Sequence, residues 1–173
     1  MKKNTILNFV ENLLFYTILI GILLTGFAFR LSTVDGKSMN PTLNNDEYLL
    51  SLKDWAVIDY NRYDIAIFDF TEEALVANGL NKNESKTGVK RIIGLPGEHV
   101  KIDGYDVYIN GEKIEQSFID TTDKSRTDFK YFEIQLGDNE YFVMGDNRNN
   151  SLDSRDVGAI NGNTFKAKLL LHF

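Results

Sequence analysis

The chain has 173 residues, 43% of them apolar and 12% aromatic, which is enough for one compact domain with a hydrophobic core. Its formal net charge of −6 argues against a nucleic-acid partner, because domains that bind nucleic acid are usually basic. Cysteine is absent, which excludes a disulfide framework, a thiolate metal site and a cysteine nucleophile, and two histidines are too few for a histidine-rich metal site. We therefore expect neither a metal nor another cofactor.

A hydrophobic segment near the N-terminus predicts a membrane-spanning helix. Residues 13–29 carry no charge, and an apolar stretch before Glu11 extends the segment back to Ile6. At about 1.5 Å per residue, a helix that starts near Ile6 is long enough to cross a hydrocarbon core of about 30 Å. A cleaved signal peptide and a buried core helix are the competing interpretations. Bulky residues at 27–30, where a cleavage site needs small ones, argue against the signal peptide.

Charge predicts the orientation of this helix. Lys2 and Lys3 precede it, and the positive-inside rule then places the N-terminus in the cytoplasm, although Arg30 on the far side weakens the asymmetry. We expect a single-pass protein of the plasma membrane in three parts, which are a cytoplasmic N-terminus over 1–5, an anchor helix over 6–30 and an extracytoplasmic domain over 31–173.

The rest of the chain is expected to be mostly β. After Arg30 the pattern has period two and is rich in β-branched and aromatic residues. Asn110-Gly111 is a strong turn dipeptide and predicts a hairpin. Polar stretches predict exposed loops over 75–88 and 121–128. The expected elements are short antiparallel strands at 48–52, 65–70, 89–93, 99–102, 107–114 (the hairpin), 131–134, 141–144 and 166–173.

Two loop motifs indicate nucleophilic chemistry. The chain has two prolines, one in the segment 35–43 with Ser38 and one in the segment 89–98 with Lys90. Proline fixes φ, so both loops are stiff. A serine hydroxyl needs a base, and a lysine that apolar neighbours desolvate can be neutral at working pH. His99 and His172 have no polar motif around them and are expected to be ordinary residues. A turn serine and a solvent-facing lysine remain the alternative from spacing alone.

Three motifs in the chain resemble those of the type I signal peptidases, which cut signal peptides from exported proteins. These motifs are Gly36-x-Ser38-Met39-x-Pro41-Thr42-Leu43, Lys90-Arg91-Ile92-x-Gly94-x-Pro96-Gly97-Glu98 and Gly145-Asp146-Asn147-Arg148-x-x-Ser151-x-Asp153-Ser154-Arg155. A fourth, at 64–68, follows Tyr63, where the family often has glycine. The match covers about 34–158 and is similar to the Gram-positive branch. It implies an antiparallel signal-peptidase-type β fold with one transmembrane helix and a small β cap insertion at about 101–138.

The resemblance also implies a role for each matched residue. Ser38 would be the nucleophile, Lys90 the general base, and Ser151 would orient the Lys90 amine. One branch of the family has a serine where this chain has Gly36, so a side-chain donor to the oxyanion is missing here. The resemblance also implies two ion pairs that brace the site, Asp146 with Arg91 and Asp153 with Arg155. It further implies that Val34 and Val89 line pockets for the small substrate residues at positions −1 and −3 of the cleavage site.

The implied partners are the signal peptides of secreted preproteins and the lipid bilayer, and the protein would act as a monomer. Ser38 lies only eight residues past Arg30, which holds the site at the membrane face. Three alternatives remain open. They are an accessory or dedicated relative for surface or pilus protein assembly, a self-cleaving repressor-type protease with the same chemistry, and an anchored β domain that binds a surface partner. The anchor and the lack of a DNA-binding segment argue against the repressor type.

Overall fold

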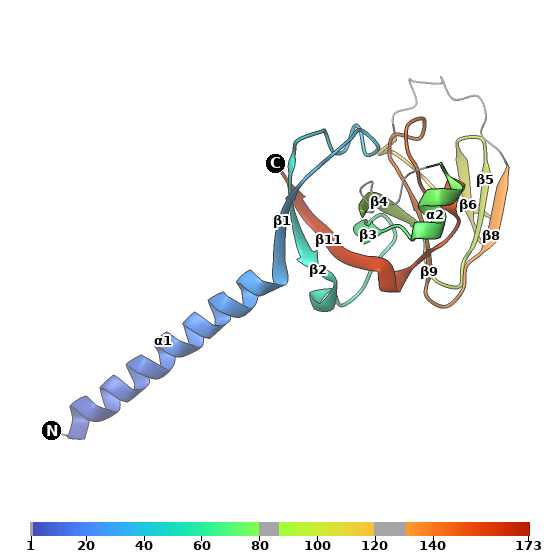
Figure 1. The fold of residues 1–173 in the computed structure, drawn as a ribbon. Coiled ribbons are helices and arrows are strands. Elements are labelled where there is room, and N and C mark those ends of the chain that lie inside the picture. The colour runs from blue at the N-terminus through green and yellow to red at the C-terminus, as the bar shows by residue number, and fades with distance from the viewer. Residues whose placement is uncertain (1, 80–86, 120–130) are drawn as a thin grey trace.

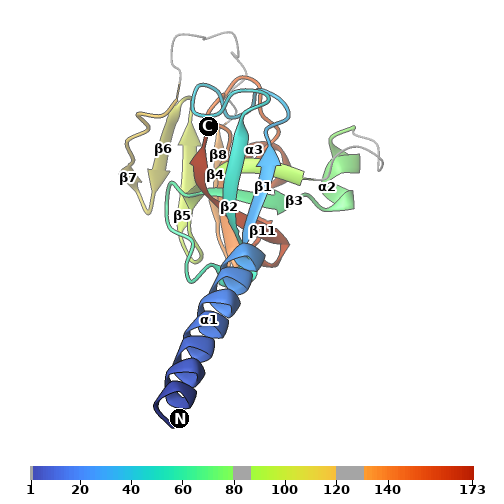
Figure 2. The same ribbon diagram turned by 90° about the vertical axis from the view of Figure 1, so that its left-hand side faces the viewer.

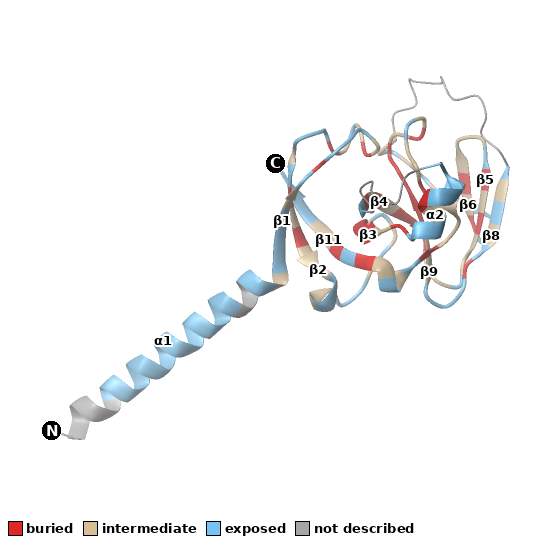
Figure 3. Ribbon diagram, in the orientation of Figure 1, coloured by how far each residue is buried: buried red, intermediate tan, exposed pale blue. Residues whose placement is uncertain are grey.

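The computed structural model describes residues 2–79, 87–119 and 131–173 and shows one long helix attached to a β domain (Figure 1). Helix α1 (Lys2–Ala28) projects away from the domain, and within it Leu7–Ala28 is long and apolar enough to cross a membrane, with no part of it buried (Figure 3). The helix ends at Ala28. Phe29 and Arg30, expected in the anchor, are extended because they pair with the neighbouring strand.

The domain is built on a seven-stranded antiparallel sheet with the strand order β1-β2-β11-β3-β4-β9-β10. Its last strand in the chain, β11, lies in the interior of the sheet and pairs with both β2 and β3. The serine loop follows β1 and Lys90 lies in β4, so β11 joins the two halves of the site. The strands are β1 (Phe29–Thr33), β2 (Tyr48–Lys53), β3 (Ile65–Asp69), β4 (Thr87–Gly94), β9 (Glu140–Met144), β10 (Ile160–Asn161) and β11 (Phe165–His172).

A smaller four-stranded sheet lies beside the first one (Figure 2). Its order is β7-β6-β5-β8, and it begins at His99, two residues before the expected start of the cap. The hairpin turns at Asn110 and Gly111, whose φ values are +51° and +87°, as an Asn-Gly turn requires. Its strands are β5 (His99–Asp103), β6 (Asp106–Ile109), β7 (Glu112–Lys113) and β8 (Phe132–Gln135).

Core packing fixes both loops of the site. Met39 and Leu43 of the serine loop are buried and pack in one cluster with Leu49. Strand β4 contributes to two other clusters, with Ile92 on one face and Ile93 on the other. Because side chains alternate along a strand, Lys90 lies on the same face as Ile92. Apolar side chains thus hold the serine loop in place, and they also fix Lys90, which lies in strand β4 and not in the expected stiff loop.

The predicted mostly antiparallel β fold is confirmed, and the expected strands occur with ends shifted by at most two residues. The loop expected over 75–88 is wrong at both ends. Helix α2 (Glu72–Ala77) begins after Thr71, whose Oγ1 accepts a hydrogen bond from the Ala74 N–H, and the end of the stretch belongs to β4. Residues 80–86, and the loop expected over 121–128, lie outside the described residues. Three short helices were not predicted, η1 (Asp54–Ala56), α3 (Ser154–Val157) and η2 (Gly162–Thr164).

Candidate active site

The serine loop connects β1 to β2 and is anchored at several points. Gly36 has a φ of +100°, a conformation that side-chain-bearing residues rarely adopt, and its N–H donates to Asn45 Oδ1 over 2.7 Å. The loop closes where the Val34 N–H donates to the Glu47 carbonyl. Met39 is 2% exposed. The loop therefore presents Ser38 from a rigid support.

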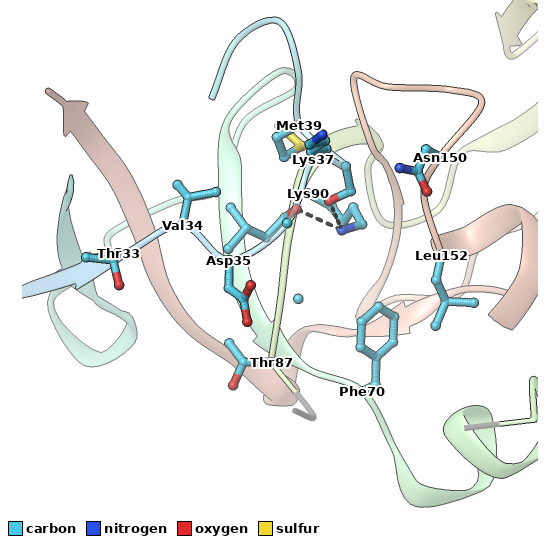
Figure 4. A pocket seen from close by; sticks show the side chains of 14 residues that line it. Thr33, Val34, Asp35, Lys37, Met39, Phe70, Thr87, Lys90, Asn150 and Leu152 are labelled. Carbon is cyan, nitrogen blue, oxygen red and sulfur yellow. Dashed lines mark hydrogen bonds between the residues drawn. The ribbon is translucent and has the colours of Figure 1, made fainter. Parts of the chain in front are cut away.

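Ser38 and Lys90 are in direct contact. Figure 4 labels Lys90 and marks its hydrogen bonds with dashed lines. Lys90 Nζ donates to Ser38 Oγ over 2.8 Å and to the Val89 carbonyl over 3.0 Å. Only 5% of Lys90 is exposed, and this burial lowers its pKa from 10.5 to about 8. Asp153 and Asp146 act in the opposite direction, but burial dominates. A substantial neutral fraction near pH 8 allows the amine to take a proton from the hydroxyl.

A buried polar cluster joins all three motifs. Asp146 is fully buried and accepts hydrogen bonds from Arg91 Nε and Nη2, at 2.9 and 2.6 Å, and from Thr42 Oγ1 at 2.6 Å. Arg91 also donates to Thr42 Oγ1 over 3.2 Å. The ring of Phe118 covers the guanidinium, with 4.3 Å from its centroid to Arg91 Cζ. The expected Arg91–Asp146 pair is thus present, and it also fixes the serine loop through Thr42.

The second expected pair lies in the third motif. Asp153 is fully buried and accepts hydrogen bonds from Arg155 Nε and Nη2, both at 2.8 Å, and from the Gly145 N–H at 2.9 Å. Burial alone would raise the pKa of Asp153, but these hydrogen bonds hold that pKa below its ordinary value. The Asp153 side chain also caps α3 in a capping box with Asp156.

Gly145 lets the third motif approach the serine loop. A Cβ at this position would lie 2.3 Å from Ser151 Oγ and 2.5 Å from the Ser38 carbonyl oxygen, so only glycine fits without a shift. The Asn147 N–H donates to the Ser38 carbonyl over 3.0 Å, and Asn147 Nδ2 donates to the Lys37 carbonyl over 3.1 Å. The sequence motif contained Asn147 but gave no reason to single it out.

Ser151 differs from its expected role. Its hydroxyl is buried and makes no hydrogen bond to Lys90 within the described part of the chain. The amine instead has Ser38 Oγ and the Val89 carbonyl as its partners. Ser151 lies against Gly145, at the back of the site. A direct hydrogen bond between Ser151 and the amine is therefore absent from the described part of the chain, and the role of Ser151 in orienting Lys90 stays a prediction.

A cavity of about 470 Å³ opens beside the Ser38–Lys90 pair. Val34 and Val89 line it, and both also pack in or against the core cluster of the serine loop. The sequence did not single out Phe70 as a wall of this cavity. A Cβ at Gly88 would lie 2.7 Å from Phe70 Cε2, so the ring lies tightly over this glycine, two residues before Lys90. The full lining comprises Thr33, Val34, Asp35, Gly36, Lys37, Ser38, Met39, Phe70, Thr87, Gly88, Val89, Lys90, Asn150 and Leu152 (Figure 4).

The two histidines lie elsewhere and pair with acidic residues. His99 Nε2 lies 2.9 Å from Glu133 Oε1, and His172 Nδ1 lies 3.2 Å from Glu47 Oε2. Neither histidine lines the cavity. Among the described residues, Lys90 is therefore the basic group in contact with the Ser38 hydroxyl.

Most of the chain is similar in sequence to known peptidases. Residues 6–173 match the family described as "Signal peptidase, peptidase S26". Signal peptidase I of Bacillus amyloliquefaciens is 33% identical over 162 residues, which cover 90% of this chain and 80% of that protein. Signal peptidase I S of Bacillus subtilis (strain 168) is 35% identical over 164 residues, which cover 90% of this chain and 81% of that protein.

A solved structure agrees with these relatives. The crystal structure of a signal peptidase I from Enterococcus faecalis V583 superposes with a TM-score of 0.51 at 25% identity and covers 66% of this chain and 99% of that one. The chain therefore belongs to the peptidase S26 family of signal peptidases. Its enzyme class is that of the type I signal peptidases.

Proposed function

We propose that this protein is a membrane-anchored endopeptidase that removes signal peptides from exported preproteins, with Ser38 as nucleophile and Lys90 as general base. The observation that carries this proposal is the 2.8 Å contact between Ser38 Oγ and the buried Nζ of Lys90. The relatives support the substrate class, because they are signal peptidases I. An accessory relative that had lost catalysis would not need a buried amine against a serine hydroxyl.

The proposed reaction has two stages. Neutral Lys90 accepts the Ser38 proton while Oγ attacks the scissile carbonyl carbon, which forms a tetrahedral oxyanion. The protonated Lys90 then gives its proton to the leaving amine, and an acyl-enzyme ester remains on Ser38. In the second stage Lys90 takes a proton from a water molecule, which attacks the ester and releases the new carboxyl end, and Ser38 regains its proton.

The oxyanion needs a donor that is already in place. The Ser38 N–H has no acceptor within the part of the chain that the structure describes, so it is available for this role. Gly36 brings no side-chain hydroxyl, and its N–H is already donated to Asn45 Oδ1. We therefore assign the Ser38 N–H as the oxyanion donor, and Gly36 as a residue that shapes the loop.

The edge of β4 offers a place for an extended peptide. Residues 87–90 pair with β3 on one side, whereas pairing with β9 begins only at Arg91. Their other edge faces the cavity, across from 33–37. Main-chain pairing along such an edge is a common way to bind an extended chain, with alternate side chains entering pockets. Val34 and Val89 would then contact small apolar side chains at −1 and −3.

Membrane attachment completes the proposal. Helix α1 would span the bilayer with the N-terminus in the cytoplasm, and the monomeric β domain would lie outside the plasma membrane with the smaller sheet as its cap. The helix is long and apolar enough for this, and the two lysines at its start agree with the orientation. The lipid bilayer and the preprotein's signal peptide would be the partners.

Ser38→Ala is expected to lower kcat/KM by at least about a thousandfold, since it removes the nucleophile. The assay uses detergent-solubilised full-length protein and a preprotein with alanine at −1 and −3, and cleavage after the −1 residue is followed by mass spectrometry. Ser51→Ala is the control, because it also removes a serine hydroxyl but Ser51, which is fully buried in β2, does not line the cavity. Equal activity of Ser38→Ala and the wild type would contradict the nucleophile assignment.

Phe70→Ala is expected to relax the preference for small residues at −1 or −3. Removing the ring enlarges the cavity on the Lys90 face, and each methylene admitted changes relative kcat/KM by roughly tenfold or more. A panel of substrates with Ala, Val or Leu at either position gives the ratio of kcat/KM for the larger residue to kcat/KM for alanine. Leu75→Ala is the control, because Leu75 belongs to the same core cluster but does not line the cavity. An unchanged ratio in Phe70→Ala would show that the ring does not limit substrate size.

A further inference from the structure

We propose that Asp35 determines a charge preference of this enzyme and favours a lysine or arginine at position −2 or −4 of the signal peptide. Its carboxylate would attract the basic side chain, while the small residues at −1 and −3 occupy the pockets. This inference rests on the proposed function and adds a preference for charge to it. The ligand is a cationic side chain of the substrate itself.

The first observation is a carboxylate in the cavity that has no partner of its own. Asp35 lines the cavity and is exposed. Within the described part of the chain, its side chain makes no hydrogen bond and no ion pair. Asn45 holds the backbone of the neighbouring Gly36 instead. The Asp35 side chain is therefore not needed to shape the serine loop, and its charge is available to a substrate.

The position of this carboxylate separates it from the general base. Asp35 comes three residues before Ser38 in the sequence, and three residues of extended backbone span about 10 Å. Figure 4 shows the carboxylate directed toward Thr87 and away from Lys90. The acidic residues that act on the pKa of Lys90 belong to the third motif. Asp35 therefore faces the substrate residues upstream of the cleaved bond rather than the base.

Thr87 adds a hydrogen-bond acceptor to the same end of the cavity. It lines the cavity three residues before Lys90, and its Oγ1 donates its proton to Asp69 Oδ1 over 3.0 Å. A hydroxyl oxygen that has donated its proton still accepts through its lone pairs. An ammonium or a guanidinium group has several N–H donors and no acceptor. A basic side chain thus finds acceptors at this end, whereas a carboxylate would be repelled by Asp35.

The other charged residues that line the cavity lie at its catalytic end. They are Lys37, which directly precedes Ser38, and Lys90. Figure 4 shows the labels of both lysines close together, with Asp35 nearer to Thr87. The cavity therefore has a carboxylate on the side where the upstream residues of a signal peptide would lie, and cations beside the bond that is cut. A basic residue upstream of −1 matches this distribution.

The alternation of side chains limits the substrate positions that Asp35 can reach. Successive side chains of an extended peptide point to opposite sides. If −1 and −3 contact Val34 and Val89, then −2 and −4 point to the open side of the cavity. Val34 is 6% exposed, whereas its neighbour Asp35 is exposed, so the two side chains face different surroundings. Asp35 thus lies on the side of −2 and −4, and the long stem of a lysine or arginine reaches it from either position.

Cleavage of soluble peptides tests this preference. The peptides have alanine at −1 and −3 and carry Lys, Gln or Glu at −2 or at −4, and kcat/KM is measured with detergent-solubilised full-length protein. At low salt we expect kcat/KM for the Lys peptide to exceed that for the Glu peptide by about fivefold at one of the two positions, with Gln between them. In 1 M NaCl the ratio should fall toward one, because salt screens exposed charges. A ratio near one at both positions at low salt would overturn the proposal.

Two variants assign the preference to Asp35. Asp35→Asn removes the charge at nearly constant shape and should lower the Lys-to-Glu ratio to less than about twofold, and Asp35→Lys should invert the ratio. Asp138→Asn is the matched control, because Asp138 is an exposed aspartate in the turn between β8 and β9 and does not line the cavity. A wild-type ratio in Asp35→Asn would overturn the assignment. If the wild type cut none of the peptides, the proposed function would fail and this inference with it, whereas cutting without a charge preference would overturn this inference alone.

Discussion

Lys90→Met is expected to abolish cleavage and, at neutral pH, to make the protein more stable. The loss of activity follows from removing the amine that contacts Ser38 Oγ. The gain in stability follows from burial, because a charged ammonium in this position is disfavoured and methionine has nearly the same length without a charge. Activity and stability thus change in opposite directions, which distinguishes a functional lysine from a structural one.

The pKa of Lys90 sets the pH range of this effect. Lowering it from 10.5 to about 8 means that below pH 8 both the folded and the unfolded states carry the proton. The folded state is then disfavoured by about 3 kcal/mol, at about 1.4 kcal/mol per pKa unit. Between pH 8 and 10.5 the unfolded state binds more protons, so the wild type becomes more stable as pH rises. The advantage of Lys90→Met is therefore largest below pH 8 and disappears near pH 10.5.

Urea denaturation of the full-length protein in detergent at pH 7 and pH 10 measures this difference. Two hydrogen bonds are lost with the amine, so the net gain at pH 7 is about 1–2 kcal/mol. Lys166→Met is the control, since this lysine is 46% exposed and its pairing with Asp69 contributes less than about 1 kcal/mol. A Lys90→Met protein that is less stable than wild type at pH 7 would show that the buried amine is structurally favourable.

Asp153→Ala is expected to lower the free energy of unfolding by about 3–5 kcal/mol, because it breaks a buried ion pair. The change removes the charge opposite Arg155, the acceptor of the Gly145 N–H and the cap of α3. Gly145 packs against the Ser38 carbonyl, so cleavage should also slow. The Asp153 contribution is present above the unfolded-state pKa and is lost as pH falls through its lowered folded-state pKa.

Asp106→Ala is the matched control for this second prediction. Asp106 also accepts from a cation, Lys113, over 2.7 Å, but both side chains are about half exposed. Exposed pairs contribute about 0.2–1 kcal/mol, so the control should unfold almost like the wild type. Thermal and urea unfolding of both variants, with the cleavage rate of each, decide the comparison. If Asp153→Ala and Asp106→Ala lowered the free energy of unfolding equally, burial would not strengthen the ion pair of Asp153.

Local patterns in the sequence were enough to predict most strands. Aromatic and β-branched content predicted β9, and the Asn110-Gly111 dipeptide predicted the hairpin. Strand β1 was not predicted, because it continues the apolar run of the helix without a glycine or proline and becomes extended by pairing with β2. Helix α2 did leave a signal that sequence reasoning missed, since Thr71 followed by two glutamates is a typical helix start.

The site was predictable to the level of the motifs but not of individual contacts. The motifs singled out Ser38 and Lys90, but they gave no sign that the Lys90 amine also donates to the Val89 carbonyl. Phe70 could not be found, because its place over Gly88 depends on the register between β3 and β4, which pairs Phe68 with Gly88. Register and side-chain rotamer are set by the whole fold, so no short sequence motif contains them.

Because β11 lies inside the main sheet but comes last in the chain, the sheet can be completed only at the end of synthesis. Strand β11 lies between β2 and β3 in the sheet, so the half with the serine loop and the half with Lys90 are not joined until residues 165–172 are in place. The ribosome makes Ser38 and Lys90 long before this strand. A nascent chain that ends before residue 165 therefore lacks the strand that pairs with both β2 and β3, and its main sheet is incomplete until synthesis is almost finished.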